Sequence, residues 1–235
     1  MGTVFKFKQF EVDQRDCAMK INTDGVLLGA LASFDQPRRI LDLGSGTGVI
    51  SLMLAQRFAE ALVDAVEIDE AAYLRTKDNF SQSIFSSRLC AYHSSFEAIE
   101  SVVDYDLIVS NPPFYTDSLH NPDAKKKLAR HTDHAFFLQV LSFAFVRLAD
   151  HGALQLILPT ELAVEVVKMA TDIGFALKRT IDIHSFAHTA SIRQIIDLRK
   201  EDKGSVKEEH FVIYKEKGEY SASYKSLLAP FFLAY

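Results

Sequence analysis

The sequence has few of the features that would place the chain in a membrane, outside the cell or around a metal ion. Its two cysteines, Cys17 and Cys90, are too few for a disulfide framework, and its eight histidines are not spaced as zinc ligands are. No apolar run approaches the roughly 20 residues of a membrane-spanning helix. The N-terminus, with Lys6 and Lys8 and no long apolar run after them, does not resemble a signal peptide. We therefore expect a cytoplasmic protein that binds no metal or membrane and has no obligate protein partner.

The chain also lacks an excess of positive charge, since 31 acidic residues against 26 lysines and arginines give a net charge of −5. Nucleic-acid affinity depends strongly on phosphate neutralisation, so this total counts mildly against a nucleic-acid partner. Local charge matters more than the total. One basic cluster is present, formed by Lys125, Lys126, Lys127 and Arg130. Taken alone it favours a solvated loop. Its position just after residues 111–114 makes a place where an RNA backbone passes an equally acceptable interpretation.

The 235 residues fit one α/β domain, with a strand and helix extension over 1–37 and a core over 38–235. In the extension, 3–12 alternates like a strand, and Thr23 and Asp24 can cap a helix that starts near Val26. Strands and helices then alternate, which favours a parallel sheet with helices on both faces. The expected core strands are 39–43, 62–67, 88–92, 105–110, 153–158, 175–184 and 192–200, with a last short strand at 211–214.

The helices between the later strands carry their own end signals. The apolar segment 133–149 predicts a largely buried helix that ends at Gly152. A second helix is expected from a Thr160 cap to about Ile173, where Gly174 terminates it. The charged segment 200–209 is expected to be a surface loop.

A glycine-rich turn follows the expected strand 39–43 and precedes a segment of helical composition. The turn consists of Gly44, Ser45, Gly46, Thr47 and Gly48. Glycines let a ligand approach the backbone, and the helix behind them offers free N–H groups. Asp42 would sit badly beside a pyrophosphate but suits an ammonium group, such as that of S-adenosylmethionine. Glu67 ends the next strand, where an acidic side chain can accept hydrogen bonds from ribose hydroxyls. The alternatives are a plain βα turn and a solvated acidic turn.

A second motif, Asn111, Pro112, Pro113 and Phe114, ends the expected strand 105–110. Two prolines stop a strand and fix a rigid extended corner. The Asn111 amide oxygen and the Pro112 carbonyl can then accept both hydrogens of one NH2 group, and Phe114 offers a flat face for stacking. The alternative is a proline turn with Phe114 in the core. The order and spacing of both motifs favour a site for a planar molecule that carries an amino group.

These residues resemble the class I methyltransferases that use S-adenosylmethionine, and Asn111 to Phe114 resembles the catalytic motif of their amino-methyltransferase branch. Five segments resemble the bacterial valine-tRNA adenine-37 N6-methyltransferases, namely Phe10–Val12, Cys17–Ala30, Ala129–His131, Tyr214–Tyr224 and Phe231–Leu233. The resemblance implies a Rossmann-like α/β fold with a seven-stranded, mainly parallel sheet. It also implies N6-methylation of adenine 37 in the anticodon loop of a tRNA, with RNA contacts near the basic cluster.

The resemblance further implies the residues of the cofactor site. Besides the glycine turn, Asp42, Glu67 and Asn111, they are Ile68, Ser95, Phe96, Lys20, Thr23 and Asp24. Relatives often have Asp where Ser95 stands, and a neutral hydroxyl should hold the adenine amino group more weakly. Thr23 and Asp24 suit a role at the methionine end of the cofactor and a role as helix cap equally well.

Three other functions fit part of the pattern. A protein glutamine N5-methyltransferase acting on a release factor would hold its amide in the same corner, but such enzymes usually carry an N-terminal helical domain and Tyr where Phe114 stands. A ribosomal RNA or DNA amino-methyltransferase is the second, although no separate target-recognition domain is visible. The third is a non-catalytic cofactor-binding module, which would have no use for the Asn111 corner.

Overall fold

The computed structural model describes residues 4–15, 17, 20–99, 104–113, 122–200 and 204–234, and for 122–133 the backbone alone. The main elements in chain order are β1 (Val4–Lys6), β2 (Glu11–Asp13), α1 (Thr23–Leu31), β3 (Arg39–Leu43), α2 (Val49–Arg57), β4 (Leu62–Glu67), α3 (Glu70–Gln82), β5 (Leu89–His93), β6 (Tyr105–Ser110), α4 (Pro122–Arg147), β7 (Leu148–Pro159), α5 (Thr160–Ile173), β8 (Phe175–Phe186), β9 (Ser191–Lys200), β10 (Lys207–Glu216), β11 (Glu219–Tyr220) and α6 (Ala222–Leu228).

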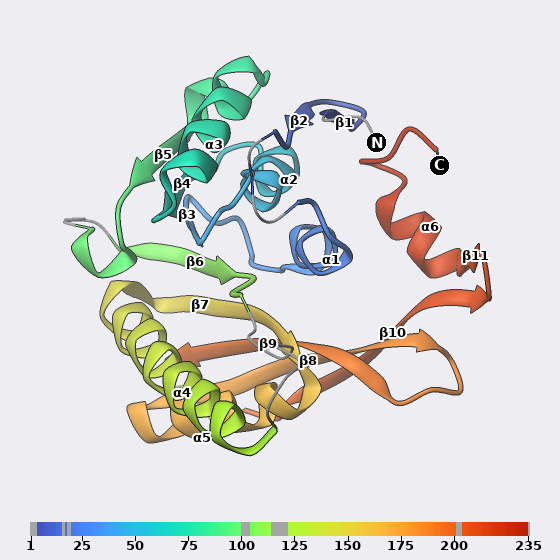
Figure 1. Cartoon of the computed structure of the whole chain (residues 1–235). Helices are drawn as coiled ribbons and strands as arrows, with labels where there is room; N and C mark the ends of the chain where they lie inside the picture. Colours follow the sequence, from blue (N-terminus) through green and yellow to red (C-terminus); the bar gives the residue numbers. More distant parts are fainter. Residues whose placement is uncertain are drawn as a thin grey trace.

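Nine of these strands form one sheet in the order β11-β10-β8-β9-β7-β6-β3-β4-β5 (Figure 1). The strands β7, β6, β3, β4 and β5 run parallel to one another, whereas β9 runs antiparallel to both β7 and β8. The expected parallel α/β sheet with a closing antiparallel pair is therefore confirmed. It is wider than the seven strands expected, because β10 joins β8 in parallel and β11 then pairs with β10.

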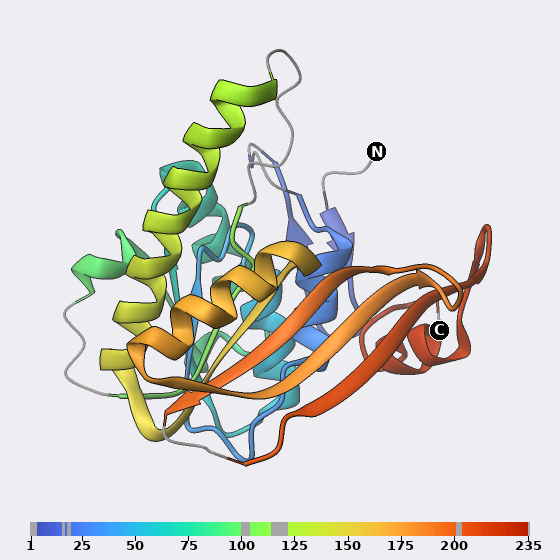
Figure 2. The same cartoon turned by 90° about the horizontal axis from the view of Figure 1, so that it is seen from below.

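Helices cover both faces of the sheet (Figures 1 and 2). Alternate residues of the central strands belong to two different cores. Ile40 and Leu107 belong to a core that contains the buried faces of α1 and α2, whereas Leu41 and Ile108 belong to a core that contains those of α4 and α5. Side chains alternate between the faces of a strand, so a strand buried on both faces is apolar throughout. No helix in the described part of the chain is long and apolar enough to cross a membrane.

The two ends of the chain pack against each other beside α2 and α3 (Figure 1). The expected N-terminal strand is a short hairpin, in which β1 pairs with β2. Phe7 forms an isolated bridge with Phe232, and the Lys8 backbone N–H donates to the Phe231 carbonyl at 2.7 Å. Phe231 is only 2% exposed. Both C-terminal phenylalanines therefore contribute to packing.

One predicted helix end was wrong, and one was confirmed. α4 ends at Arg147 rather than at Gly152, which lies within β7. A Cβ at Gly152 would lie 2.9 Å from the Tyr105 carbonyl oxygen, so this glycine allows two strands to approach rather than stopping a helix. Gly174, at φ 116°, does terminate α5.

Two predicted caps and one loop also need correction. The N-cap of α1 is Asn22, one residue before the predicted pair, because its side chain accepts from the Gly25 N–H at 2.8 Å. α5 has no side-chain cap, since the Thr160 hydroxyl donates to the Ser191 carbonyl instead. The segment predicted as a loop over 200–209 becomes strand at Lys207.

Candidate active site

The glycine turn connects β3 to α2 in a conformation that favours glycine. Gly44, Gly46 and Gly48 have φ angles of 72°, 58° and 78°. A Cβ on Gly44 or Gly46 would meet no atom within 4 Å, so the outer side of the turn is open. A Cβ on Gly48 would lie 2.7 Å from Phe80, so this glycine is required by packing. The turn thus has an open side for a ligand and a packed side against α3.

Glu67, at the end of β4, braces the turn. Its Oε2 accepts a hydrogen bond from the Gly46 N–H at 2.8 Å, and its Oε1 accepts one from the Asp69 N–H at 2.9 Å. Each carboxylate oxygen can accept a second hydrogen bond. Ile68 beside it is 71% exposed, and Asp69 caps α3 through the Ala72 N–H. Glu67 therefore holds the turn while keeping acceptor capacity for a ligand.

Asp42 lies beneath the turn and is 0% exposed. Its Oδ2 accepts from the Ser51 hydroxyl at 2.7 Å and from the Ser51 N–H at 3.2 Å. Its Oδ1 has no hydrogen-bond partner among the described residues. Burial raises the pKa of this carboxyl to about 7, against the opposing effect of the Ser51 hydrogen bonds. A buried acceptor oxygen that lacks a hydrogen-bond partner, next to an open glycine turn, fits a cationic group that approaches the turn.

Asn111 reaches the same edge of the sheet from β6. β6 pairs with β3 so that Ser110 lies opposite Leu43, and the Ser110 hydroxyl donates to the Leu43 carbonyl at 2.8 Å. The strand therefore ends beside the start of the glycine turn. Asn111 is partly buried, Pro112 is buried and Pro113 is exposed. The predicted stacking residue Phe114 lies outside the described residues.

A residue that the sequence analysis did not select completes this corner. The Asn111 Nδ2 donates to the Oδ1 of Asn22 at 3.4 Å. A Cβ at Gly25 would lie 3.4 Å from that Oδ1 and 3.6 Å from Asn111 Nδ2, so the first turn of α1 packs directly beside the corner. The resemblance had singled out the neighbouring Thr23 and Asp24, and no local pattern distinguishes Asn22 from an ordinary cap.

The other predicted residues near α1 are close to Asn22 in sequence but have different surroundings. Lys20 and Thr23 are exposed. The Asp24 carboxylate forms an ion pair with Arg193 at 2.7 Å, which joins α1 to the start of β9. The Asp24 carboxylate is therefore already paired with a guanidinium group of the same chain.

The predicted adenine-side residues follow β5. The Ser94 N–H donates to the Glu67 carbonyl at 3.1 Å, so Ser95 lies next to the end of β4. Phe96 packs edge-on against Phe136 and Phe143 of α4. The predicted RNA-binding residues fall on the first half of α4, where the side chains lie outside the described part of the chain; they are Lys125, Lys126, Lys127 and Arg130.

Two further residues support the turn from α3. The Thr76 hydroxyl donates to the Gly46 carbonyl at 2.8 Å, and Asn79 Nδ2 donates to the Thr47 carbonyl at 2.9 Å. Asn79 also exchanges two hydrogen bonds with the Asp13 backbone at the end of β2. Their spacing of three residues puts both side chains on one helix face, which is the signal that could have revealed them.

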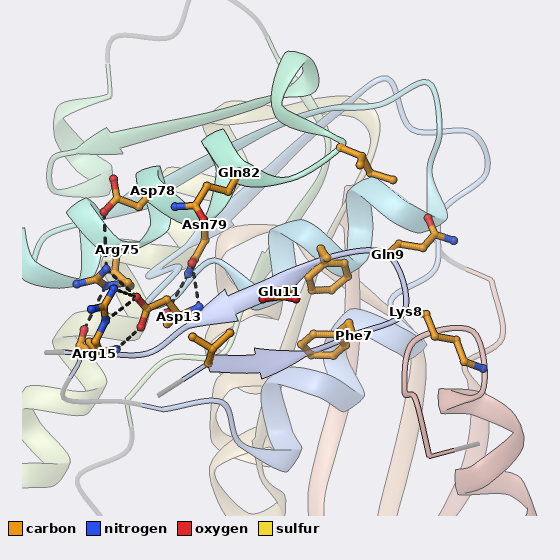
Figure 3. A pocket seen from close by; sticks show the side chains of 13 residues that line it. Phe7, Lys8, Gln9, Glu11, Asp13, Arg15, Arg75, Asp78, Asn79 and Gln82 are labelled. Atoms are coloured by element: carbon orange, nitrogen blue, oxygen red, sulfur yellow. Dashed lines mark hydrogen bonds and ion pairs between the residues drawn. The ribbon is translucent and has the colours of Figure 1, made fainter. Parts of the chain in front are cut away.

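Asn79 lies on the wall of a cavity of about 510 Å³ between the hairpin and α3 (Figure 3). Four of its charged side chains pair with one another. Asp13 accepts from Arg75 at 3.1 Å and forms an ion pair with Arg15 at 2.6 Å. No residue of the glycine turn or the Asn111 corner lines the cavity, so it is separate from the candidate site.

A mainly parallel sheet, a glycine turn after β3, an acidic residue ending β4 and an Asn-Pro-Pro corner ending β6 together define a class I methyltransferase. A model of the methyltransferase small domain family matches residues 23–174. The tRNA1(Val) (adenine(37)-N6)-methyltransferase of Pedobacter heparinus is 48% identical over 236 residues, which cover 100% of both chains. That of Parabacteroides distasonis is 38% identical over 97% of both chains. The chain therefore belongs to the family of tRNA1(Val) (adenine(37)-N6)-methyltransferases.

Solved structures show the same fold at lower identity. Protein Atu636 of Agrobacterium tumefaciens, described as a predicted O-methyltransferase, matches with a TM-score of 0.70 at 18% identity, over 88% of this chain and 96% of that one. TrmN of Thermus thermophilus matches with a TM-score of 0.55 at 21% identity, over 75% of this chain and 48% of that one. The expectation of a class I methyltransferase fold is confirmed.

Proposed function

We propose that the protein transfers a methyl group from S-adenosylmethionine to N6 of adenine 37 in the anticodon loop of a valine tRNA, in the cytoplasm. The observation that carries this proposal is the position of Asn111 and Pro112 at the end of β6, beside the open glycine turn. Relatives with this named activity match the chain from end to end, which supports the choice of substrate.

The residues of the sheet edge suit S-adenosylmethionine, which supplies an electrophilic methyl group on a sulfonium. The Glu67 carboxylate has acceptor capacity left for ribose hydroxyls. The Asp42 Oδ1, buried beneath the turn and without a hydrogen-bond partner among the described residues, would receive the ammonium group of the methionine end. Lys20, Thr23 and Asp24 border that end. The Ser95 hydroxyl can accept from the adenine amino group, with Ile68 and Phe96 as apolar neighbours. Each of these roles is part of the proposal.

The Asn111 corner performs the transfer by positioning the acceptor. An unpaired loop base swings out of its stack at modest cost. The Asn111 amide oxygen and the Pro112 carbonyl accept the two N6 hydrogens, which draws the nitrogen lone pair out of ring conjugation and aims it at the methyl carbon. The new N–C bond forms as the carbon–sulfur bond breaks, and the N6 proton leaves to water. Holding reacting atoms in line contributes about 7–11 kcal/mol in favourable cases.

Phe114 is proposed to stack on the target base and the basic cluster on α4 to contact the RNA backbone. The test is methyl transfer from labelled S-adenosylmethionine to unmodified valine tRNA, followed by nucleoside mass spectrometry. A tRNA with guanine at position 37 and a release factor protein serve as parallel acceptors. We expect N6-methyladenosine in the first tRNA alone, and Asn111→Ala should lower turnover at least about 100-fold.

Asn111→Ala should also keep its affinity for S-adenosylmethionine within about threefold, since the glycine turn, Glu67 and Asp42 would still hold the cofactor after one side-chain contact is lost. Equal loss of cofactor binding would mean that Asn111 is structural. Label in the protein and none in either tRNA would refute the proposed substrate while leaving the methyltransferase assignment intact.

A further inference from the structure

We propose that Asn22 is a positioning residue that fixes the orientation of the Asn111 side-chain amide. This inference rests on the proposed function, because it concerns the acceptor that the target amine meets. Asn22 lies just before α1, outside the glycine turn and outside the Asn-Pro-Pro motif.

The orientation of Asn22 is itself fixed. As N-cap of α1 it accepts the Gly25 N–H at 2.8 Å through Oδ1, and a backbone N–H can only donate. The atom of Asn22 that faces Gly25 is therefore the oxygen. This same oxygen lies 3.4 Å from the Asn111 side chain. An oxygen that already accepts a hydrogen bond can accept another but has no hydrogen to give.

The consequence for Asn111 follows from the asymmetry of an amide. One end of the group is an acceptor and the other is a double donor, and a half-turn about the last bond exchanges them at little steric cost. Because Asn22 presents an oxygen, Asn111 must present Nδ2 towards it. Its own Oδ1 then faces the other way and accepts no hydrogen bond from the described residues. The reversed amide would direct its NH2 group at the target amine and repel it.

The packing keeps this pair together. Gly25 lies against both amides, and the third atom near its missing Cβ belongs to Ile50 of α2, at 3.7 Å. Asn22 and Asn111 are 89 positions apart in the chain, so the contact depends on α1 being docked on α2. The cap of one helix thereby determines which end of the catalytic amide meets the substrate.

Three substitutions at Asn22 distinguish its role as N-cap of α1 from its role in orienting the Asn111 amide. Asn22→Ser keeps a good N-cap, but its hydroxyl is one covalent bond shorter than the amide and does not reach Asn111. Asn22→Asp keeps an acceptor for both partners. Asn22→Ala removes both functions. Ser221→Ala is the matched control, because Ser221 caps α6 by accepting the Tyr224 N–H at 3.0 Å, away from the site.

The measurement is the single-turnover rate constant at saturating S-adenosylmethionine and acceptor, with cofactor affinity by calorimetry and stability by urea unfolding. For Asn22→Ser we expect a rate about tenfold lower, with cofactor affinity within about twofold and little change in stability. Asn22→Asp should recover most of that loss. Ser221→Ala should lower stability and leave the rate within about twofold of the wild-type value.

An Asn22→Ser rate within twofold of the wild-type value would overturn the inference. So would equal losses in Asn22→Ser and Asn22→Asp, or a parallel loss of cofactor affinity, which would place Asn22 in the cofactor pocket instead. The wild-type enzyme is assayed first with valine tRNA and release factor. Failure of the proposed function appears there, whereas the Asn22 series is measured on whichever acceptor the wild-type enzyme methylates.

Discussion

The buried carboxyl of Asp42 predicts that the affinity for S-adenosylmethionine changes with pH. Burial raises its pKa to about 7, so the side chain titrates in an accessible range. If the ammonium group of the ligand binds only the ionised form, the apparent dissociation constant is divided by the ionised fraction. That fraction rises from about 3% at pH 5.5 to about 50% at pH 7. Affinity should therefore increase about fifteenfold over this interval.

This interval also keeps the ligand in one form, because an α-amino group has an ordinary pKa of about 7.7–8.0. The assay is calorimetric titration at pH 5.5, 6, 6.5 and 7. Methylthioadenosine, which lacks the amino-acid part of the cofactor, serves as the control ligand and should bind equally across the series. Asp42→Asn should bind S-adenosylmethionine about tenfold more weakly at pH 7, and without pH dependence.

Ser51→Ala gives an independent check of the same reasoning. The Ser51 hydroxyl donates to Asp42 at 2.7 Å and lowers its pKa, so removing the hydroxyl should shift the affinity curve to higher pH.

The raised pKa of Asp42 also means that the folded state binds more protons than the unfolded state. The contribution of Asp42 to the free energy of unfolding therefore falls as pH rises from about 4 to 7. A flat affinity for the cofactor in wild-type protein, or the same slope in Asp42→Asn, would refute the ammonium role.

Two further predictions concern stability. Asn79→Ala leaves the backbones of Asp13 and Thr47 without buried partners. The free energy of unfolding in urea should therefore fall by about 2–3 kcal/mol, and the cofactor should bind more weakly. The control Ser81→Ala, at an exposed position, should change neither quantity. Hydrogen bonds from Arg179 lower the pKa of Glu209 to about 2, so the stabilisation is present above the ordinary value of 4.5 and is lost as pH falls through about 2. Glu209→Gln should therefore lower the free energy of unfolding by about 1–2 kcal/mol at pH 7 and by little at pH 2, and an equal loss at both values would contradict the assignment.

Local sequence was sufficient to predict the elements that carry the two motifs. The strands at 39–43, 62–67 and 105–110 have the predicted bounds, because each is a short apolar run followed by glycine, acidic or proline residues. Parallel strands bring their carboxyl ends to one edge of the sheet, so the sequence alone predicts that the glycine turn, Glu67 and Asn111 lie together. The boundary of the N-terminal extension stays a prediction, as do the ligand roles of the individual side chains.

The contacts that were missed join residues far apart in the chain. Asn22 meets Asn111 across 89 positions, and Asn79 meets Asp13 across 66. No neighbour in sequence marks Asn22 as more than a cap, whereas Asn79 shares a helix face with Thr76, a spacing that could have marked it. Gly152 is ambiguous in sequence, because a helix stop and a close strand approach require the same residue. The packing of α1 and α3 and the approach of β7 to β6 distinguish these interpretations.

The N-terminal extension takes part in both halves of the site. Through Asp13 it is hydrogen-bonded to Asn79, which in turn holds the Thr47 carbonyl of the glycine turn. Through Asn22 it contacts the amide that we propose to receive the target amine. Displacement of this extension would therefore disturb the glycine turn and the Asn111 corner together. On the roles that we propose for these two parts, cofactor binding and methyl transfer should depend on one another.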